Sequence, residues 1–577
     1  MTHPTQAPHG DNTEELLRSL SISRLGTTSL RESLVGFCEK ISVIPNIDRA
    51  SEIILSAALD RRRILVFGDY DADGVCSVAA MVRLLRFMGA DPMIMLPNRM
   101  TDGHGVSPTA SDKIVGLAPE VLIVLDCGTT ASRQFAVIAE TVGTILVIDH
   151  HSAPPADTPP MPANTVLVNP AILPETEDAR RLFGISSAGV LTYLTILRTV
   201  RSWRARGDFP EVEAVRSLLN QCLALGALTA VADMVPMMGI NRAMVQAGLK
   251  HARSLPGLWA IGGAMKYKIT PENITVGDVG FKYGPTINAA GRIADGGLAL
   301  DLMISDEPVD VLAKGAAQVV GLNEQRREIT ADVIDACLGD AGADCGSLIV
   351  NDDFHQGVVG LAASRLLETT RRPAIVVGTN GAGSARSVPG FHIGNFVGEQ
   401  VAAGNLLKGG GHAGAAGFTV IPERLDAFRA AFEEATKGVV RKDREPDITI
   451  TSSGQIDIRT IHDSLAPFGM GNPDLLLHLV APKISGQRWF GGENRNSHMS
   501  FKVEIGREIV DCIVFYAAGK PWTPAPGNMF APGGIQSMTG TLRVEYDNYH
   551  KEMRMKFSVS DMVAPGKTTL PLAAAPA

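Results

Sequence analysis

The chain has 577 residues, more than one ordinary hydrophobic core accommodates, so its length predicts two to four domains. Its net charge of −8 excludes nucleic-acid binding through an overall positive charge, and leaves a local patch or metal ions for that purpose. Seven scattered cysteines without a CxxC pair indicate a reducing cytoplasm, and no apolar run is expected to act as a signal sequence or to span a membrane. Residues 1–55 are expected to form a polar tail and short helices.

Short β-rich apolar runs that alternate with helical stretches occupy the next part of the chain. The runs are RILVF at 63–67, VLIVL at 121–125 and TILVI at 144–148. Buried runs separated by helices are typical of a parallel sheet in an α/β architecture. A long helical region over roughly 213–253 follows, and residues 56–320 are assigned to one α/β domain.

The second half of the chain contains a connector, a second α/β domain and a β-rich domain. A charged stretch at 321–345 predicts a connecting helix, and strand and helix patterns resume over 346–440. Beyond a polar linker, residues 445–565 carry β-rich runs and turn residues, which predict a small barrel or sandwich. The last residues, 566–577, are expected to be disordered. The predicted fold class is a multidomain α/β chain with a C-terminal β-barrel.

Each of the three apolar runs in the first domain ends in residues that can bind a metal. They are Asp69, Asp71 and Asp73 after the first run, Asp126 after the second, and Asp149, His150 and His151 after the third. Ligands of open α/β sheets bind outside the carboxyl ends of the strands, so we expect these side chains to share one edge. Such a cluster repels itself unless cations neutralise it, and oxygen and imidazole ligands suit Mn²⁺ or Mg²⁺.

Each of these motifs has a simpler explanation when it is taken alone. A single DxD motif is most often a solvated turn, and a DHH motif is most often a capped loop. Asp233 follows a long apolar helix and is by itself a helix terminator before Pro236. The coincidence at three strand ends favours a joint metal site over three unrelated turns.

The motifs together resemble the DHH phosphoesterase family, and within it the RecJ family of bacterial single-strand-specific exonucleases. The matching motifs occur in family order: GDYDADG (68–74), NRMTDGHG (98–105), LDCGTT (125–130), DHH (149–151), ALTAVADMVP (227–236), INAAGR (287–292), FHQGVVGLAASRL (354–366), GSARSVPGF (383–391), GGGHAGAAG (409–417) and PFGMGNP (467–473). The family architecture agrees with the boundaries above. It consists of a DHH domain, a connecting helix, a DHH-associated domain and an OB-fold.

The resemblance implies roles for named residues. It implies metal ligands for two Mn²⁺ or Mg²⁺ ions at Asp71, Asp73, Asp126, His150 and Asp233. It implies catalytic roles or catalytic support for Asp69, Asp126, His150 and His151. It implies substrate contacts at Arg99, Asn288, Arg292, Ser384, Arg386, Ser387, Gly411 and His412. Two such ions acidify a bridging water and clamp an in-line displacement, with Asp126 as the expected bridging ligand.

Three positions depart from the family pattern. Phe67 stands where some relatives carry a histidine ahead of the first aspartates, and this change is expected to weaken or reshape one metal position. Thr286 stands where many relatives carry arginine, so one phosphate contact is expected to be missing. His104 stands where tyrosine is common, which keeps a flat ring.

The second α/β domain is expected to hold the substrate. GAGSARSVPG (381–390) reads as a turn-rich loop, in which Arg386 can bind a phosphate bidentately. Plain turn chemistry is the alternative for this loop and for the glycine-rich stretch around His412. The resemblance places a 5′-phosphate between the Arg386 loop and the motif of Arg99. The alternative for Arg99 is a surface ion pair with Asp102.

The β-rich domain is expected to bind single strands. Arg488, Trp489 and Phe490 are candidates for stacking on bases, and an ordinary strand with two core aromatics is the alternative. The β-rich domain should add affinity for DNA rather than catalytic groups, so that a chain ending near Arg444 should still cleave its substrate.

The predicted function is that of a metal-dependent 5′→3′ exonuclease that degrades single-stranded DNA to mononucleotides in DNA repair and recombination. One alternative is a DHH phosphoesterase for oligoribonucleotides or cyclic dinucleotides, against which the residues beyond 445 argue. Another is a non-catalytic replication-associated scaffold, against which the intact acidic set argues. The candidate partners are single-stranded DNA, a single-strand-binding protein and a RecQ-type helicase, and no membrane.

Overall fold

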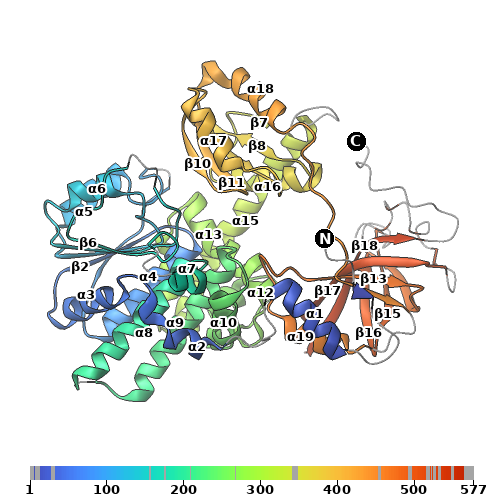
Figure 1. Ribbon diagram of the computed structural model, residues 1–577, viewed down its shortest axis with the longest axis horizontal. Helices are drawn as coiled ribbons and strands as arrows, with labels where there is room; N and C mark the ends of the chain where they lie inside the picture. The colour runs from blue at the N-terminus through green and yellow to red at the C-terminus, as the bar shows by residue number, and fades with distance from the viewer. Residues whose placement is uncertain are drawn as a thin grey trace. The chain divides into compact units, whose positions relative to one another are not determined.

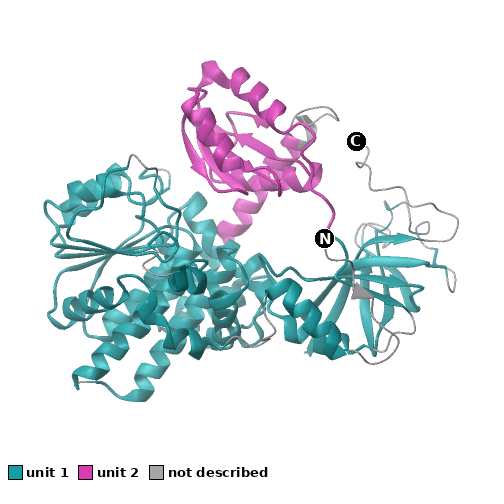
Figure 2. Ribbon diagram, in the orientation of Figure 1, with its two compact units in different colours: residues 1–320, 445–569 teal, residues 321–444, 570–577 magenta. Residues whose placement is uncertain are grey.

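The computed structural model divides into two compact units (Figure 2). The first comprises residues 1–320 and 445–569, and the second comprises residues 321–444 and 570–577. The structure describes residues 5–6, 13–26, 33–99, 101–154, 158–173, 177–207, 209–266, 268–340, 348–451, 456–491, 497–514, 517, 520, 523, 528–530, 534–547 and 552–563. The tail at 566–577, for which disorder was expected, lies outside the described residues.

A five-stranded parallel sheet forms the centre of the N-terminal part of the first unit (Figure 1). Its strands lie in the order β3 (Met93–Met95), β2 (Ile64–Gly68), β4 (Val121–Leu125), β5 (Thr144–Ile148) and β6 (Thr165–Val168). Helices α5 (Pro108–Leu117) and α6 (Ser132–Ile138) cover one face, and α3 (Ile47–Leu59) and α4 (Ala72–Phe87) cover the other. This double covering explains why the strands are continuous apolar runs. The prediction that the three runs form neighbouring strands is confirmed.

A helical layer completes the first domain, where helices were expected over roughly 213–253. Its long members are α8 (Ala188–Arg206), α9 (Val212–Ala232) and α10 (Gly239–Gly248). The shorter helices are α2 (Leu34–Glu39), η1 (Ile41–Val43), α7 (Glu177–Phe183), η2 (Leu249–Ser254), α11 (Pro256–Ala264), η3 (Pro271–Asn273), α12 (Val276–Asp278), η4 (Val279–Tyr283), α13 (Gly284–Ile293) and α14 (Gly297–Ile304).

Helix α9 is long and apolar enough to cross a membrane, so the expectation that no apolar run reaches that length is wrong. Helices α7 and α8 pass the same test only as a pair, which is bent by 115°. In α9, 67% of the most apolar stretch is buried inside the protein, where it packs against α4, α8 and α10. These contacts are those of a core helix.

The second unit is an α/β domain that follows a long helix. The helix expected at 321–345 is α15 (Val309–Asp340), which begins before the predicted range. The sheet has the order β10 (Leu406–Gly411), β11 (Ala415–Val420), β9 (Ala382–Arg386), β8 (Ala374–Val377) and β7 (Leu348–Val350). The helices are η5 (Thr379–Gly381), α16 (Val359–Thr370), α17 (Ile393–Ala402), η6 (Pro422–Arg424) and α18 (Leu425–Ala435).

The C-terminal part of the first unit is an eight-stranded mixed sheet. Its strands have the order β1 (Thr5–Gln6), β12 (Ile448–Thr451), β13 (Leu475–Val480), β17 (Ser537–Asp547), β18 (Glu552–Val563), β16 (Glu508–Val514), β15 (His498–Ile505) and β14 (Ile484–Phe490). Helices α19 (Ile458–Leu465) and α1 (Thr13–Leu25) pack on its core. The N-terminal segment, predicted as a polar tail with short helices, therefore adds an edge strand and a core helix to this sheet.

Candidate metal centre

Strand register brings the acidic residues to one edge of the first sheet. Gly68 at the end of β2 pairs with Leu125 of β4, which in turn pairs with Ile148 of β5. The next residues along the chain are Asp69, Asp126 and Asp149, so the three carboxylates leave the sheet side by side, as the sequence predicts. All three are nearly fully buried.

The first turn of α4 carries the next two aspartates. Asp71 caps this helix, because its Oδ1 accepts hydrogen bonds from the N–H groups of Asp73 and Gly74 at 3.0 and 3.1 Å. The Asp73 carboxylate is held by a second helix terminus: Ala188 and Gly189 at the start of α8 donate their N–H groups to it at 2.9 and 2.8 Å. The positive end of the α8 dipole thus supports the Asp73 charge.

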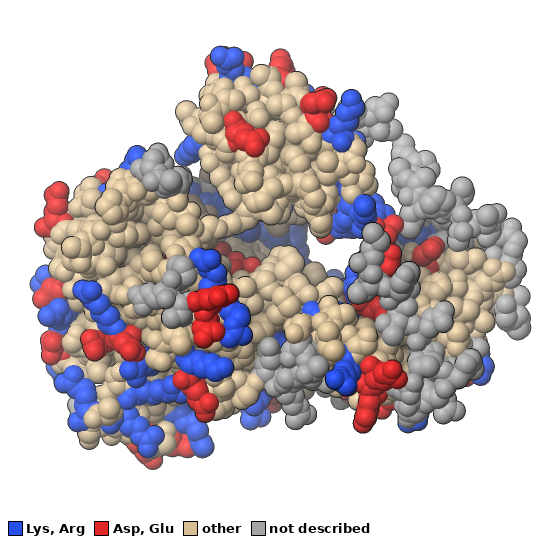
Figure 3. All heavy atoms as spheres, in the orientation of Figure 1, with Lys and Arg blue, Asp and Glu red and all other residues tan. Residues whose placement is uncertain are grey.

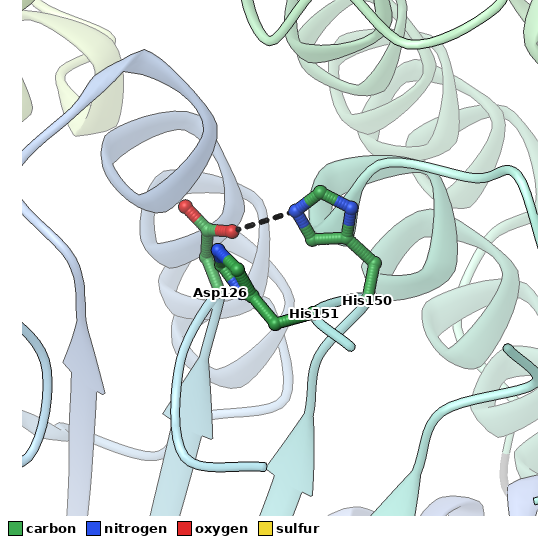
Figure 4. Close-up of side chains that lie close together, drawn as sticks. All are labelled: Asp126, His150 and His151. Atoms are coloured by element: carbon green, nitrogen blue, oxygen red, sulfur yellow. Dashed lines mark ion pairs between the residues drawn. The ribbon is translucent and has the colours of Figure 1, made fainter. Parts of the chain in front are cut away.

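His150 lies at the centre of the carboxylates. Its Nε2 is 3.4 Å from Asp126 Oδ1, 3.5 Å from Asp233 Oδ2 and 3.7 Å from Asp73 Oδ2. Figure 4 shows the imidazole of His150 directed at the Asp126 carboxylate, with His151 beside both. Asp233, which was also expected as a helix terminator, caps the C-terminus of α9 and reaches the cluster as well.

Asp149, which the sequence placed in the acidic cluster without a specific ligand or catalytic role, supports this centre through hydrogen bonds. Its carboxylate accepts hydrogen bonds from the backbone N–H groups of Thr129, His150 and His151. It also lies 2.7 Å from His151 Nδ1. This contact orients the His151 ring and leaves Nε2 for the cluster, the usual arrangement around a metal-binding histidine. The signal for this role was present in the sequence as the acid that immediately precedes the two histidines.

The pKa values report crowding of like charges. Burial and the charge of Asp71 raise the pKa of Asp73 to about 7. Burial and the neighbouring carboxylates, Asp73 first, raise the pKa of Asp126 and of Asp233 well above its usual range. Burial also raises the pKa of Asp69 to about 6, although the charge of His104 opposes the shift. A cluster with this charge distribution is stabilised by cations.

The pKa values of Asp149 and His151 are instead those of an ion pair, lowered for the acid and raised for the base. Burial raises the pKa of Asp149, but the hydrogen bond and charge of His151 outweigh it and hold that pKa well below its usual range. Burial lowers the pKa of His151, but the hydrogen bond and charge of Asp149 outweigh it and raise that pKa to about 9.

Two overlapping sets of side chains have ligand atoms close enough to hold cations. Asp126, His150 and His151 form one, and Asp73, His150 and Asp233 form the other, with ligand atoms within 4.8 Å of one another in each. The donors are carboxylate oxygens and imidazole nitrogens without thiolate, a set that suits Mn²⁺ or Mg²⁺. Asp69 Oδ1 is also buried without a hydrogen-bond partner in the described part of the chain. The residues present therefore fit two divalent cations.

Cationic side chains flank the centre beside Asp71. The Arg99 guanidinium lies over the Tyr70 ring, 5.6 Å from its centroid, and the Tyr70 hydroxyl lies 3.1 Å from His104 Nδ1. Burial and the charge of Arg99 lower the pKa of Arg292, whereas the charge of Asp71 opposes this shift. The alternative ion pair of Arg99 with Asp102 is wrong, since Asp102 pairs with Lys113 at 2.7 Å.

Asn288 has a structural contact in addition to its predicted role. Its Oδ1 accepts the N–H of Ala72 at 2.6 Å, which fixes the start of α4.

The structure places the three positions that depart from the family pattern. Phe67 is fully buried in the core on one face of the sheet, and the Thr286 hydroxyl donates to the Lys282 carbonyl at 2.7 Å. His104 Nδ1 lies 3.2 Å from Asp69 Oδ2, so this substitution brings an imidazole to the centre.

The candidate substrate residues of the second unit surround β9. Residues 382–386, expected as part of a turn-rich loop, form this strand because they pair with β8 and β11 on both sides. Alternation along the strand points Ser384 and Arg386 to the same face, and Arg386 Nη1 donates to Ser384 Oγ at 2.9 Å. Ser387 Oγ donates to the Phe391 carbonyl at 2.8 Å.

The glycine-rich stretch turns between two strands of the same sheet. Gly411 ends β10, where a Cβ would lie 2.3 Å from the Ala415 carbonyl oxygen, so only glycine fits without a backbone shift. His412 is exposed in the turn. No described contact tests the predicted substrate roles of these residues.

In the C-terminal sheet, the predicted stacking residues lie on the edge strand β14. Trp489 packs against the core, and its indole N–H donates to the Asn528 carbonyl at 2.6 Å. For Trp489 this favours the alternative of an ordinary core aromatic over that of a base-stacking residue. Arg488 is exposed, with its Nε 3.0 Å from Ser500 Oγ, and Phe490 contacts the His498 ring.

Family models match three parts of the chain. The N-terminal domain of the DHH family matches residues 63–227, the DHHA1 domain matches residues 345–438, and the RecJ OB domain matches residues 451–561. The order of the three domains is that expected from the motifs, and the OB-type C-terminal domain is confirmed.

Curated relatives cover most of the chain. The single-stranded-DNA-specific exonuclease RecJ of Dickeya dadantii is 30% identical over 89% of this chain and 91% of its own length. The protein of that name from Salmonella typhimurium is 32% identical over 73% of this chain and 74% of its own length. The one from Escherichia coli is 32% identical over 68% of this chain and 69% of its own length.

Solved structures share the fold. RecJ from Thermus thermophilus, in complex with Mn²⁺, superposes with a TM-score of 0.69 over 91% of this chain and 72% of that chain, at 24% identity. A structure of exonuclease RecJ bound to manganese superposes with a TM-score of 0.55 over 68% of this chain and 94% of that chain, at 27% identity.

Proposed function

The chain belongs to the RecJ family of single-stranded-DNA-specific exonucleases, and on that basis we propose that it hydrolyses single-stranded DNA with two divalent cations. From the family resemblance we also infer that it degrades from the 5′ end, releases mononucleotides and acts in DNA repair and recombination. The observation that carries the proposal is the convergence of Asp73, Asp126 and Asp233 on His150 Nε2.

The residues that would hold the cations are those of the two overlapping sets, with Asp71 close by. Bound Mn²⁺ or Mg²⁺ ions would supply an acidified water and charge relief on the phosphoryl oxygens. Asp126 belongs to one set and also contacts His150, which both sets share, so we assign it the bridging position.

The remaining side chains orient groups and exchange protons. Asp69, whose pKa is about 6, can accept a proton near neutral pH. His104 Nδ1 lies 3.2 Å from it, and the His104 side chain is 66% exposed, so this ring can pass the proton to solvent. Before a cation binds, His151, with a pKa of about 9, carries a proton and a positive charge beside the Asp126 carboxylate, and it would lose this proton when its Nε2 binds a cation.

The charge on the protein surface agrees with local rather than global binding of DNA. Lys and Arg side chains are interspersed with Asp and Glu on the face seen in Figure 3. Arg99 and Arg292 beside the metal centre, Arg386 on β9 and Arg488 on β14 are the cations that we assign to phosphate contacts.

The alternative of a phosphoesterase for oligoribonucleotides or cyclic dinucleotides is disfavoured by the C-terminal domain, which adds a surface for longer strands. The scaffold alternative is disfavoured by the complete ligand set. A single-strand-binding protein and a RecQ-type helicase are proposed as partners on family grounds. A cytoplasmic location is proposed because all six described cysteines are free.

The deciding experiment is digestion of end-labelled DNA by the purified chain. With Mn²⁺, a 5′-labelled single strand should release labelled mononucleotide from the start of the reaction, while the same strand in a duplex should resist. EDTA should stop the reaction. Release of the 3′ label first would contradict the proposed direction, and equal cutting of a dinucleotide and a long strand would favour the small-substrate alternative.

A further inference from the structure

The loop that follows Asp233, residues 234–238, has to keep the Asp233 carboxylate in an unfavourable electrostatic environment. The Asp233 carboxylate lies at the C-terminus of α9, where the helix dipole is unfavourable to a negative charge. It also faces the like charges of Asp73 and Asp71. Among the described residues, none donates a hydrogen bond to this carboxylate, and the nearest partner is His150 Nε2 at 3.5 Å. Its place therefore depends on how the loop is held.

A distant part of the chain holds the far end of this loop. We call residues 466–473 the clamp segment; it follows α19 and contains the PFGMGNP motif. Its Met470 carbonyl accepts the N–H of Met237 at 2.7 Å. Its two glycines approach the loop so closely that a Cβ on Gly469 would lie 3.2 Å from Met237 Cε, and one on Gly471 would lie 3.4 Å from Met238 Cε.

A buried arginine of α10 binds the start of the clamp segment and the end of α19 that precedes it. Arg242 is 1% exposed, and its guanidinium donates to the carbonyls of Ser464, Leu465 and Pro467 at 3.0, 2.7 and 3.3 Å. Asn472, which is fully buried, donates from Nδ2 to two of these carbonyls, at 2.9 and 3.0 Å. A buried guanidinium is costly to leave without partners, so this connection is strongly specified.

The same loop is tied to the second helix terminus of the metal centre. Asn241 Nδ2 donates to the Pro236 carbonyl at 3.0 Å and to the Ile185 carbonyl at 2.7 Å. Ile185 lies three residues before Ala188, the first residue of α8, whose N–H groups hold Asp73. The loop thus lies between the clamp segment on one side and the Asp73 anchor on the other.

From these contacts we infer that Arg242 and the clamp segment are positioning elements of the metal centre, which hold Asp233 against the repulsion of its neighbours. The inference rests on the proposed function for the identity of the cation. The PFGMGNP motif then acts as a structural part of the catalytic domain, and it joins that domain to the C-terminal sheet.

The test is the Mn²⁺ affinity of the full-length chain, measured from the electron paramagnetic resonance signal of free Mn²⁺ without any substrate. Arg242→Met should weaken Mn²⁺ binding by about tenfold or more, the range seen when groups that orient metal ligands are removed. Arg83→Met is the matched control. Arg83 is also buried, at 5% exposure, and donates to the carbonyls of Met303 and Ser305 as well as to Asp306, but it lies near the end of α4 that points away from Asp73.

The control should lower the thermal stability and leave Mn²⁺ affinity unchanged. An Arg242→Met chain that binds Mn²⁺ as tightly as the wild type overturns the inference, and so does an equal loss in Arg83→Met. If Arg242→Met does not fold, Asn472→Ala decides by the same measurement, with weaker binding expected. Failure of the wild type itself to bind Mn²⁺ would instead overturn the proposed function.

Discussion

At the scale of single residues, the metal centre is held in conformations and charge states that the isolated side chains would avoid. Asp126 has a left-handed backbone, with a φ of 62°, although it is not a glycine. Its N–H is fixed by the Ile148 carbonyl at 3.0 Å. Strain of this kind persists only where the surrounding structure imposes it, and it is common at functional sites.

Asp126→Asn should abolish cleavage while leaving the chain folded. The amide keeps the shape of the carboxylate but removes the charge of the assigned bridging ligand, so kcat should fall by at least about 100-fold. The metal-free variant should also melt at a higher temperature than the metal-free wild type, because one repelling charge has been removed. The measurements are initial rates with Mn²⁺ and thermal melts in EDTA.

The control for that variant is Asp102→Asn, which removes a buried carboxylate that pairs with Lys113 outside the cluster. It should lower the melting temperature and leave the Mn²⁺ dependence intact. Near-normal activity of Asp126→Asn would show that Asp126 is not a ligand.

Arg386→Ala should distinguish recognition of the 5′-terminal phosphate from binding of internal phosphates of the strand. A terminal 5′-phosphate carries more charge than an internal one, and a charge-assisted contact to it contributes about 1.5–3 kcal/mol. We expect kcat/KM to fall about tenfold or more on 5′-phosphorylated strands and much less on 5′-hydroxyl strands. Arg365→Ala, which removes an exposed arginine of α16, is the control. An equal loss on both substrates would instead show that Arg386 binds internal phosphates of the DNA strand.

At the scale of elements, helix termini and close helix–strand packing aim the functional groups. The starts of α4 and α8 meet at Asp73, so two helix dipoles face the centre. In the second unit, α16 packs on β9 through Gly360, where a Cβ would lie 2.9 Å from Arg386 Nη2 and 3.0 Å from Ser384 Oγ. The glycine therefore leaves room for the guanidinium.

Gly360→Ala should displace Arg386 and reproduce part of its loss. We expect kcat/KM on 5′-phosphorylated strands to fall a few-fold, together with a small gain in stability, because alanine favours the helix by about 0.5–1 kcal/mol. Gly398→Ala in α17 is the matched control, since a Cβ there meets open space. It should give the same gain in stability without the kinetic loss. Identical kinetics in the two variants would contradict the proposed role of Gly360 in placing the Arg386 guanidinium.

At the scale of the whole molecule, the raised pKa values link cation binding to stability. Asp69 and Asp73 have pKa values of about 6 and about 7, above the value near 4 of an unfolded aspartate. Between about pH 4 and 7 the folded chain therefore binds more protons than the unfolded chain, and stability falls as the pH rises. The stability from His151, with a pKa of about 9, is present below about pH 6.5 and is lost as the pH rises to 9.

We therefore expect the metal-free chain to melt several degrees lower at pH 8 than at pH 5, since each kcal/mol shifts the melting temperature of a large domain by roughly 2–4 °C. Saturating Mn²⁺ should flatten this dependence, because cations neutralise the same carboxylates. Thermal melts over this range, with EDTA or with Mn²⁺, are the measurement. A metal-free chain that gains stability from pH 5 to 8 would contradict the charge distribution described here.

The clamp segment changes what is expected of a shortened chain. The sequence suggests that a chain ending near Arg444 still cleaves, but such a chain lacks the partners of Met237 and Arg242. We now expect it to lose Mn²⁺ affinity along with DNA affinity. Arg488→Ala in the full chain should weaken only DNA binding, with a shallower dependence on salt. Normal Mn²⁺ affinity in a folded chain ending at Arg444 would restore the earlier expectation.

The sequence by itself determined the parallel sheet, the acidic strand ends and the divalent metals that suit them. These features are local, because each is a short apolar run followed directly by its ligands. The parallel order of the strands then brings Asp69, Asp126 and Asp149, which directly follow these runs, to one edge of the sheet. The four family motifs in the second half, between residues 354 and 473, are local in the same sense, because each is one short continuous stretch of the sequence.

Only the tertiary structure decided how distant residues meet. His150 contacts Asp233, which lies more than eighty residues later, and Arg242 binds carbonyls more than two hundred residues away. The strand at 382–386 forms because two neighbouring strands supply hydrogen bonds to a stretch that is rich in glycine and serine. Such contacts depend on packing between elements and leave no periodic pattern in the chain, so the clamp on the Asp233 loop becomes visible only when the elements are placed in space.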